Sequence, residues 1–460
     1  AMRLSSLATL RRREWADLRP GLNETLLENL DRLRLAPILV NADPQSPHLP
    51  LSELRQAERG VGDHPLTIFD AQKRFVFDFA HVFFDGPWSI ALAEILTREA
   101  LAWAVYLQGR EAPVEIERPV MMKPLLLPFE QCESIFIQQA DTATVEVNVE
   151  STVVEVKSIL ALRKLFKMRS DLLGLTVNDL LVLHRAIHAV TYQPDPELVV
   201  MLERLAEDPK LEAAASQALA AMQPAGQSPA ILIPINARPK EPSERIYPLV
   251  VDVPVTELNL LDLHQRTIET LNTYEQSAAK ERVNAYAKFD RLQRHYLATL
   301  AGFGQVLSRA RERAVHGESA GPDSLKLLAH MPAPVQRLLD QAPDRFDVLN
   351  ELMKGQEVLV NVGAATPGSS LSRFNAAKDD HEQKVLAWGV LTDADGTMHV
   401  SLRDFRPHVA ALVAAGRREL ARRIAQHYVD SYARGLNGLV SDLSRITRTS
   451  RESQIVPPPA

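Results

Sequence analysis

The stretch from Phe75 to Ala104 constrains the fold more than any other part of this chain. Its first six residues are aromatic and apolar with little polar relief, which is typical of a buried strand. Pro87 is favoured in the first turn of a helix. Apolar side chains then recur at roughly helical spacing, at Trp88, Leu92, Ile95, Leu96 and Trp103. We therefore predict a buried strand joined to an amphipathic helix by a short connection.

His81, Asp85 and Gly86 lie on this connection with the spacing H-x-x-x-D-G. Imidazole is the side chain best suited to move a proton near neutral pH, and an aspartate four residues later is placed to hold the turn or to orient the ring. A junction between a strand and a helix holds reactive groups on a rigid base. The alternative is a core histidine with a satisfied hydrogen bond and an Asp-Gly pair that only makes the turn.

Size and composition limit the class of protein. A chain of 460 residues exceeds the usual size of one hydrophobic core, so we expect two lobes. Its 46% hydrophobic and 24% charged residues are those of an ordinary globular protein, and a net charge of −6 without a dense basic stripe gives no indication of nucleic-acid binding. No apolar run approaches the roughly 20 residues that a membrane span requires. Charged residues interrupt the start early, so no signal peptide is predicted and a cytoplasmic location is expected.

The remaining pattern predicts strands and helices in a mixed order. The single cysteine, Cys132, excludes an internal disulfide and is interpreted as an ordinary buried or surface thiol. The expected elements are a half-buried strand within residues 142–156, a buried helix at 177–190 capped by Thr176, strands at 231–235, 247–255 and 357–362, a hairpin turning at Asp395-Gly396, a helix at 409–437 and a disordered tail from Ser444.

Two histidine-containing groups suggest metal ligands only in isolation. His184 and His188 lie one helical turn apart, but no carboxylate or third ligand is near them in the sequence. Asp379, Asp380 and His381 are flanked by further charges and are interpreted as a solvated turn. A metal hydrolase would require one of these groups to converge on a common point. The loop from 366 to 372 lacks the lysine of a phosphate-binding loop and is interpreted as flexible.

Four short motifs occur in a fixed order along the chain. They are the H-x-x-x-D-G segment His81–Gly86, the segment Thr176–Asp179 with the pattern T-x-N-D, a strand that ends at Arg238, and the Asn-x-Gly of residues 361–363. This order resembles the chloramphenicol acetyltransferase-like superfamily, which includes CoA-dependent acyltransferases, the condensation domains of nonribosomal peptide synthetases and relatives of wax ester synthase. The resemblance covers roughly residues 65 to 440.

The resemblance implies a fold and a division into lobes. The expected fold is α/β with mixed sheets, in which two similar lobes form a V around a central tunnel. Residues 1–156 would form the N-terminal lobe, which carries the H-x-x-x-D-G motif, and residues 157–443 the C-terminal lobe, with a flexible tail at 444–460.

The resemblance also implies an activity and the residues for it. An acyl group would pass from a thioester, on CoA or on the phosphopantetheine arm of an acyl carrier protein, to a hydroxyl or amine of a small-molecule acceptor. His81 would be the general base; Asp85, in a salt bridge to Arg238, and Gly86 would fix the shape of the loop. Asn361, Gly363 and Trp388 are expected to line the tunnel. The thioester would be a co-substrate, with no metal and no permanently bound cofactor.

The sequence also departs from the superfamily pattern. Ala80 stands where condensation domains carry a second histidine, and Leu386–Gly389 only echoes their Asp-Phe-Gly-Trp-Gly element. The first 60 residues match no part of the pattern. A catalytically inactive scaffold or binding protein is therefore the alternative function. A His81 that solvent reaches between the lobes would favour the enzyme, and a His81 sealed in a core would favour the scaffold.

Overall fold

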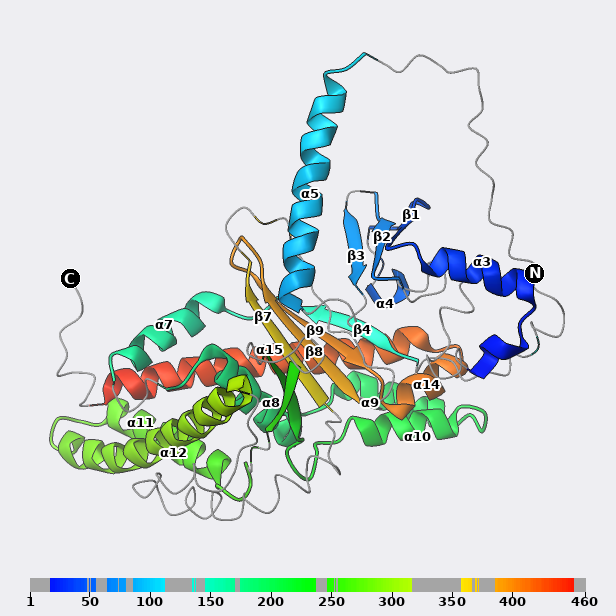
Figure 1. Cartoon of the computed structure of the whole chain (residues 1–460). Helices are drawn as coiled ribbons and strands as arrows, with labels where there is room; N and C mark the ends of the chain where they lie inside the picture. The colour runs from blue at the N-terminus through cyan, green and yellow to red at the C-terminus, as the bar shows by residue number, and fades with distance from the viewer. Residues whose placement is uncertain are drawn as a thin grey trace.

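The computed structural model has the mixed α/β architecture that the sequence predicts (Figure 1). It contains two sheets, and each combines parallel with antiparallel pairing. The residues described are 17–54 without 48 and 50, 64–79 without 73, 86–111, 135, 137, 145–169, 174–236, 246–316 without 252 and 254, 357–365, 369, 371 and 385–450.

The smaller sheet has three strands in the order β1-β2-β3. The strands are β1 (Ile38–Asn41), β2 (Leu66–Asp70) and β3 (Phe75–Phe79), and β1 is preceded by η1 (Arg19–Gly21) and α3 (Glu24–Arg34), with α4 (Leu51–Leu54) between β1 and β2. Asn23 caps α3 by accepting a hydrogen bond from the backbone N–H of Leu26, which satisfies a donor that the helix cannot pair internally. Leu26 and Leu30 of this helix are buried.

Helix α5 (Gly86–Gln108) follows β3, as the strand–connection–helix pattern predicts. The prediction that β3 is buried is wrong, because Phe75 is 58% exposed and the other residues of the strand are only half-buried. Figure 1 shows it projecting away from the larger sheet. Trp88, Leu101 and Trp103 are 60% exposed or more, so the amphipathic spacing of α5 does not correspond to a buried face among the described residues. No helix in the described part of the chain is long and apolar enough to cross a membrane.

The larger sheet has six strands in the order β4-β9-β8-β7-β5-β6. The strands are β4 (Val147–Ser151), β5 (Ile231–Asn236), β6 (Ile246–Val251), β7 (Glu357–Ala364), β8 (Leu386–Thr392) and β9 (Met398–Asp404). Strands β5, β7 and β8 are parallel to one another, while β9 pairs antiparallel with both β8 and β4. Strands β4, β5, β7 and β8 consequently share one direction, and their carboxyl ends lie at the same end of the sheet.

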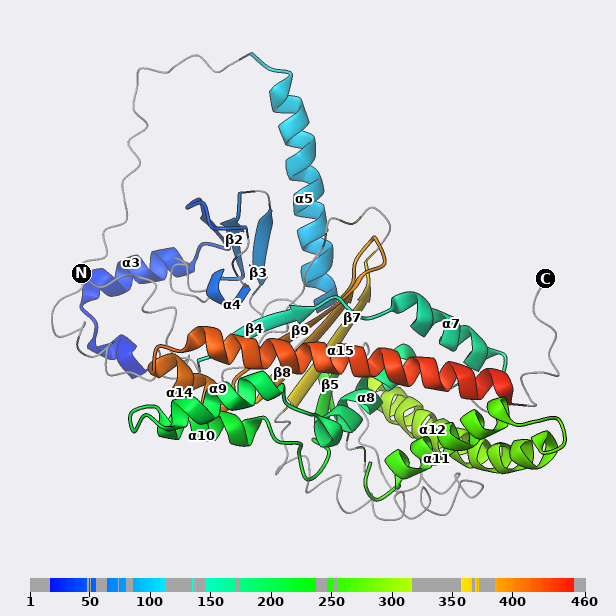
Figure 2. The same ribbon diagram turned by 180° about the vertical axis from the view of Figure 1, so that it is seen from behind.

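Helices cover the face of the larger sheet that Figure 2 turns toward the viewer. The longest of them, α15 (Arg418–Thr449), crosses the strands and places a row of apolar side chains against them. The other helices are α7 (Val156–Lys167), α8 (Val177–Thr191), α9 (Pro196–Ala206), α10 (Glu212–Ala221), α11 (Leu260–Gln276), α12 (Arg282–His316) and α14 (Pro407–Ala414). Trp388, Val400 and Leu402 from the strands join this core.

The structure corrects the sequence predictions near the C-terminus. The helix predicted at 409–437 is two helices, α14 and α15, because Gly416 turns the chain with a positive φ of 71°. Helix α15 continues to Thr449, and Ile446 is fully buried, so a flexible tail cannot begin at residue 444. The predicted hairpin turn at Asp395-Gly396 is confirmed, and Gly396 has a φ of 83°.

Strand β4 bears on the predicted lobe boundary. It lies before residue 156, yet it pairs with β9 at the edge of the larger sheet. The predicted N-terminal segment therefore gives one strand to the sheet of the C-terminal part. The prediction that β4 is half-buried is also wrong, because Asn148 on its polar side is as buried as Val147 and Val149 on its apolar side. The V-shaped arrangement around a tunnel stays a prediction.

Candidate functional site

The H-x-x-x-D-G motif lies on the connection between β3 and α5. Strand β3 ends at Phe79 and α5 begins at Gly86, so the elements on both sides of the motif are confirmed. His81 and Asp85 themselves lie outside the described residues. The same holds for Arg238, which comes two positions after the end of β5, and for Cys132 and the segment 379–381.

Two of the later motifs are associated with neighbouring parallel strands: Arg238 follows β5 in the sequence, and the Asn-x-Gly of residues 361–363 lies within β7. Strand β5 pairs with β7 through Ile231 and Glu357, and Asn361 and Gly363 stand at the carboxyl end of β7. Strand β5 ends at Asn236 at this same end of the sheet, two positions before Arg238 in the sequence. The carboxyl ends of neighbouring parallel strands are where open α/β sheets commonly place their ligands. Figures 1 and 2 draw the first turn of α5 toward this end as well.

Asn361 and Gly363 form a bulge near the carboxyl end of β7, which continues to Ala364. The Gly363 backbone N–H donates to Oδ1 of Asn361 at 2.9 Å, and Gly363 has a φ of 87°, a conformation that favours glycine. The register between β7 and β8 shifts at this bulge. Gly363 is exposed and Asn361 is partly exposed, so both are accessible at the carboxyl end of the sheet. Their predicted contact with a tunnel stays a prediction.

Trp388 does not have the position that a tunnel-lining residue requires. Its side chain is fully buried on the sheet face that α15 covers. The indole lies 5.0 Å from the ring of Tyr432, measured between ring centroids, and its Nε1–H donates to Oε2 of Glu357 at 3.3 Å. We therefore correct this prediction, because alternation along β8 points residue 388 into the core.

The T-x-N-D motif begins α8 as predicted. Thr176 is the N-cap, and Asp179 completes a capping box with it. The buried carboxylate of Asp179 also pairs with Arg311 of α12, whose Nη2 lies 2.8 Å from Oδ1. Asp179 thus completes the cap of α8 and holds α12 against this helix through an ion pair, which is a structural role for this motif.

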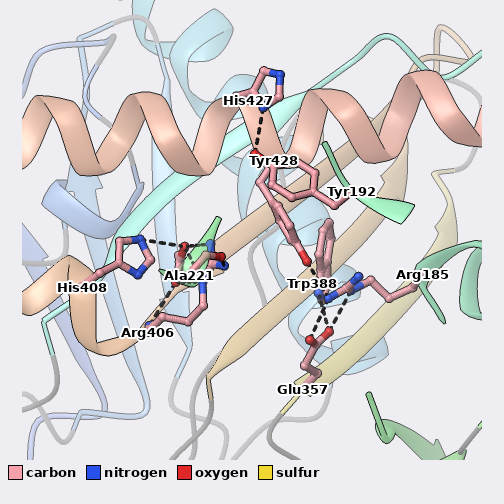
Figure 3. A network of polar contacts seen from close by, with 10 residues as sticks. Arg185, Tyr192, Ala221, Glu357, Trp388, Arg406, His408, His427 and Tyr428 are labelled. Carbon is pink, nitrogen blue, oxygen red and sulfur yellow. Dashed lines mark hydrogen bonds and ion pairs between the residues drawn. The ribbon is translucent and has the colours of Figure 1, made fainter. Parts of the chain in front are cut away.

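A network of buried polar side chains lies between α8, α15 and the strands (Figure 3). The guanidinium of Arg185 makes a bidentate ion pair with Glu357, with Nη2–Oε1 at 2.7 Å and Nε–Oε2 at 2.8 Å. Arg185 also donates to the hydroxyl of Tyr428 at 2.9 Å and stacks over the Trp388 ring. Burial opposes the charge of Arg185, but Glu357 more than compensates, and the pKa of Arg185 stays above its ordinary value.

A second buried ion pair lies beside the first. Arg406 contacts Asp404 with Nη2–Oδ2 at 2.6 Å, and its guanidinium lies 4.9 Å from the ring centroid of Tyr428. Burial disfavours the charged form of Asp404, but Arg406 holds the pKa of this carboxyl below its usual value. His408 is 4.0 Å from the same carboxylate, and burial lowers its pKa to about 4. The aspartate therefore balances Arg406 and leaves His408 neutral.

The histidine pair of α8 belongs to this core and not to a metal site. Nε2 of His184 donates to the backbone carbonyl of Tyr432 at 2.9 Å, and Nδ1 of His188 accepts from Arg185 at 3.4 Å. Burial lowers the pKa of His184 to about 4 and that of His188 to about 2, so both rings are neutral. Among the described residues, no three histidine, cysteine or acidic side chains are placed to hold a metal ion.

The opposite face of the larger sheet carries a different set of polar side chains along β4 and β9. Arg403 pairs with Glu146, with Nη2–Oε2 at 2.6 Å. His399 bridges two carboxylates: its Nδ1 lies 2.6 Å from Oε1 of Glu150 and its Nε2 lies 2.9 Å from Oδ2 of Asp393. His399 and its two carboxylates stand toward the carboxyl ends of β4 and β8, while the Arg403–Glu146 pair lies at the amino end of β4.

Sequence interpretation missed both polar clusters. Arg185, His184 and His188 stand in an otherwise apolar helix, and an arginine in such a helix requires a buried acid as its partner. That signal was available, but the partner, Glu357, is 172 residues away in the sequence and was identifiable only from the fold. His399 had no local signal beyond the alternation of its strand.

Comparison with known proteins gives distant structural similarity only. No protein-family model and no curated protein matches the sequence. The epimerization domain from the third module of tyrocidine synthetase B is 10% identical, with a TM-score of 0.36 over 92% of this chain and 90% of that chain. A wax ester synthase/diacylglycerol acyltransferase from Marinobacter aquaeolei VT8 is 12% identical, with a TM-score of 0.27 over 82% of this chain and 72% of that chain.

At 10% and 12% sequence identity, these two comparisons concern the fold alone. Their TM-scores lie below 0.5, so the roles assigned below rest on the residues of this chain.

Proposed function

We propose that this protein is an acyltransferase. It moves an acyl group from the thioester of CoA or of an acyl carrier protein to a hydroxyl or amine of a small acceptor. One observation carries the proposal: H-x-x-x-D-G stands between β3 and α5, while Arg238 follows β5 in the sequence and Asn-x-Gly lies in the last half of the neighbouring parallel strand β7. The motifs are far apart in the sequence, but β5, which precedes Arg238, and β7, which contains Asn361 and Gly363, are neighbours in one sheet.

His81 is the general base in this proposal. A neutral imidazole with a pKa near its ordinary value of about 6.5 accepts the acceptor's proton as the acceptor oxygen or nitrogen attacks the thioester carbonyl. The oxyanion that forms requires hydrogen-bond donors, for which backbone N–H groups are suitable. The thiol of CoA or of phosphopantetheine then leaves and takes up the proton. Neither a metal nor a bound cofactor enters these steps.

Asp85 and Arg238 fix the loop in this proposal and do not transfer protons. Removal of either side chain would leave the other charge without its partner, at a cost of about 3–5 kcal/mol if the pair is buried. Variants of this pair are therefore expected to lose stability and activity together. A His81 variant is expected to lose activity alone.

Mass-spectrometric acyl transfer tests the proposal. The protein is incubated with a panel of acyl-CoAs and acyl carrier proteins and with pooled alcohols and amines, in parallel with His81→Ala and with a control, His295→Ala, at an exposed position of α12. Loss of a positioned general base lowers the rate by about 10²–10⁴-fold. We expect that loss for His81→Ala, an unchanged rate for His295→Ala and unchanged melting temperatures for both.

The other outcomes are equally informative. Product formation by His81→Ala at the parent rate would exclude His81 as the base. If the parent forms no product with any donor and His81→Ala melts several degrees lower, His81 is a packing residue. That result would favour the inactive scaffold or binding protein.

A further inference from the structure

His399 is held between two carboxylates that come from different elements. Glu150 belongs to the edge strand β4, and Asp393 begins the turn between β8 and β9. Both ring nitrogens of His399 lie within 2.9 Å of a carboxylate oxygen. A carboxylate only accepts hydrogen bonds, so both nitrogens must donate, and the ring in this geometry is the imidazolium cation.

Glu150 and Asp393 are the charged groups that contact His399 within 3 Å in the described part of the chain. Arg403, the next charged residue on the same face of β9, is engaged by Glu146. The carboxylate of Glu150 comes from β4, that of Asp393 from the turn, and their hydrogen bonds with His399 are short. All three side chains keep 13–16% of their surface exposed, so protons can exchange with solvent.

The geometry points to a pH-operated clip. We propose that protonated His399 fastens the carboxyl end of β4 to the β8–β9 turn, and that deprotonation releases this end of the sheet. Strand β4 is an edge strand whose ladder contacts are with β9, and Gln426 of α15 donates to the Glu150 carbonyl at 2.9 Å, so the clip adds a tie to the β8–β9 turn that neither contact provides. The turn is also tied to the chain beyond β7, because the Ala365 N–H donates to the Thr392 carbonyl at 2.7 Å.

The direction of the pH dependence follows from the partners. The hydrogen bond to Glu150 and then that to Asp393 raise the pKa of His399 above 6.5, against the opposing effect of burial. A group whose pKa is raised by folding contributes fully below the unfolded value and loses that contribution as pH rises through the folded value. The hydrogen bond from His399 also lowers the pKa of Asp393, so this carboxylate stays charged at mildly acidic pH. The clip is therefore closed near pH 6 and opens toward pH 9.

Hydrogen exchange measured by mass spectrometry tests the clip in the full chain. Protection of residues 147–151 and 391–399 is compared at pH 6 and pH 9 after correction for the intrinsic exchange rate. In the parent we expect protection of both segments to fall severalfold between these pH values, because the stabilisation by the charged ring is lost as His399 deprotonates. In His399→Gln, which cannot carry the charge, protection should be low at both.

Two controls separate the clip from general loss of structure. Asp393→Asn keeps the histidine and removes one carboxylate, and should show a smaller pH effect than the parent. His295→Gln removes an exposed histidine of α12 and should behave as the parent does. Equal protection of the parent at pH 6 and pH 9, or a parent-like pH effect in His399→Gln, would overturn the proposal. So would a change that spreads equally to α11, because the effect would then be global.

Discussion

Histidines on the two faces of the six-stranded sheet have opposite charge states. On the face that α15 covers, His184, His188 and His408 are buried without a carboxylate of their own, and burial lowers their pKa. On the other face, His399 has a carboxylate on each ring nitrogen and its pKa is raised. The first set is neutral at physiological pH, and the second is the charged member of a clip.

The difference shows that a residue type does not determine its charge state in a fold. Desolvation favours the neutral form of an imidazole, and a hydrogen-bonded carboxylate favours the cation. The α15 face places its acids against arginines, Glu357 against Arg185 and Asp404 against Arg406. Those acids are therefore already balanced and do not charge the nearby histidines.

Loss of the buried Arg185–Glu357 ion pair should cause the largest change in the free energy of unfolding. Replacement Glu357→Gln leaves the guanidinium of Arg185, whose side chain is 1% exposed, without its counter-charge. Breaking a buried pair from one side typically costs about 3–5 kcal/mol, so we expect a loss of that size in the free energy of unfolding measured by denaturant titration.

A matched surface pair provides the control. Arg445 and Glu275 are 38% and 45% exposed, and exposed pairs contribute at most about 1 kcal/mol, so Glu275→Gln should change stability little. Equal effects of the two replacements would show that the α15 face is not the desolvated environment described above.

Several elements were predictable because their signal is local. The strand β3, the helix α5 after Pro87, the Thr176 cap and the turn at Asp395-Gly396 all depend on neighbouring residues, and each is found. The buried pairs were not predictable in this way. Arg185 and Glu357 meet only because β7 lies beneath α8, and periodicity carries no information on which strand lies beneath which helix.

The residues of the candidate site show the same difference between local signals and contacts that depend on the fold. The resemblance of the motifs identified His81, Asp85 and Arg238, and Asn361 and Gly363 lie at the accessible carboxyl end of β7. Trp388 was assigned to the tunnel because it stands in a motif-like segment. The side of the sheet that it faces depends on the position of α15, which a local motif cannot report.

The next largest expected effect is a fall in the free energy of unfolding at acidic pH. Because folding lowers the pKa of His184, His188 and His408, their contribution is present above the unfolded value of about 6.5 and is lost as pH falls below it. Each such histidine adds about 1.4 kcal/mol per pH unit to the slope while the folded form stays neutral. Denaturant titrations from pH 7 to pH 5 should therefore show a falling free energy of unfolding.

The replacement His408→Leu removes the contribution of one histidine to this pH dependence. Both ring nitrogens of His408 are buried without a hydrogen-bond partner, so an apolar side chain of similar size should cost little at pH 7. Below pH 6.5, the slope of the free energy of unfolding against pH should decrease by about 1.4 kcal/mol per pH unit, which corresponds to one proton. An unchanged slope would mean that His408 is charged in the folded protein, and the contrast with His399 would then be lost.

The smallest effect tests how tightly α15 packs on the neutral histidines. A Cβ added at Gly435 would lie 2.8 Å from the His184 ring, which the Tyr432 carbonyl holds in place, whereas one added at Gly438 would meet nothing within 4 Å. Both glycines stand inside α15, where alanine is favoured by about 1 kcal/mol. Gly438→Ala should therefore raise the free energy of unfolding.

Gly435→Ala should lower it, since overpacking costs about 1–3 kcal/mol and exceeds the gain in helix propensity. Thermal melts of the two variants, measured side by side, give the sign directly because the helix is common to both. If both variants gained stability equally, the His184 ring would have room to move away from α15. Its hydrogen bond to Tyr432, and with it the fixed neutral tautomer on this face, would then not be a rigid feature of the core.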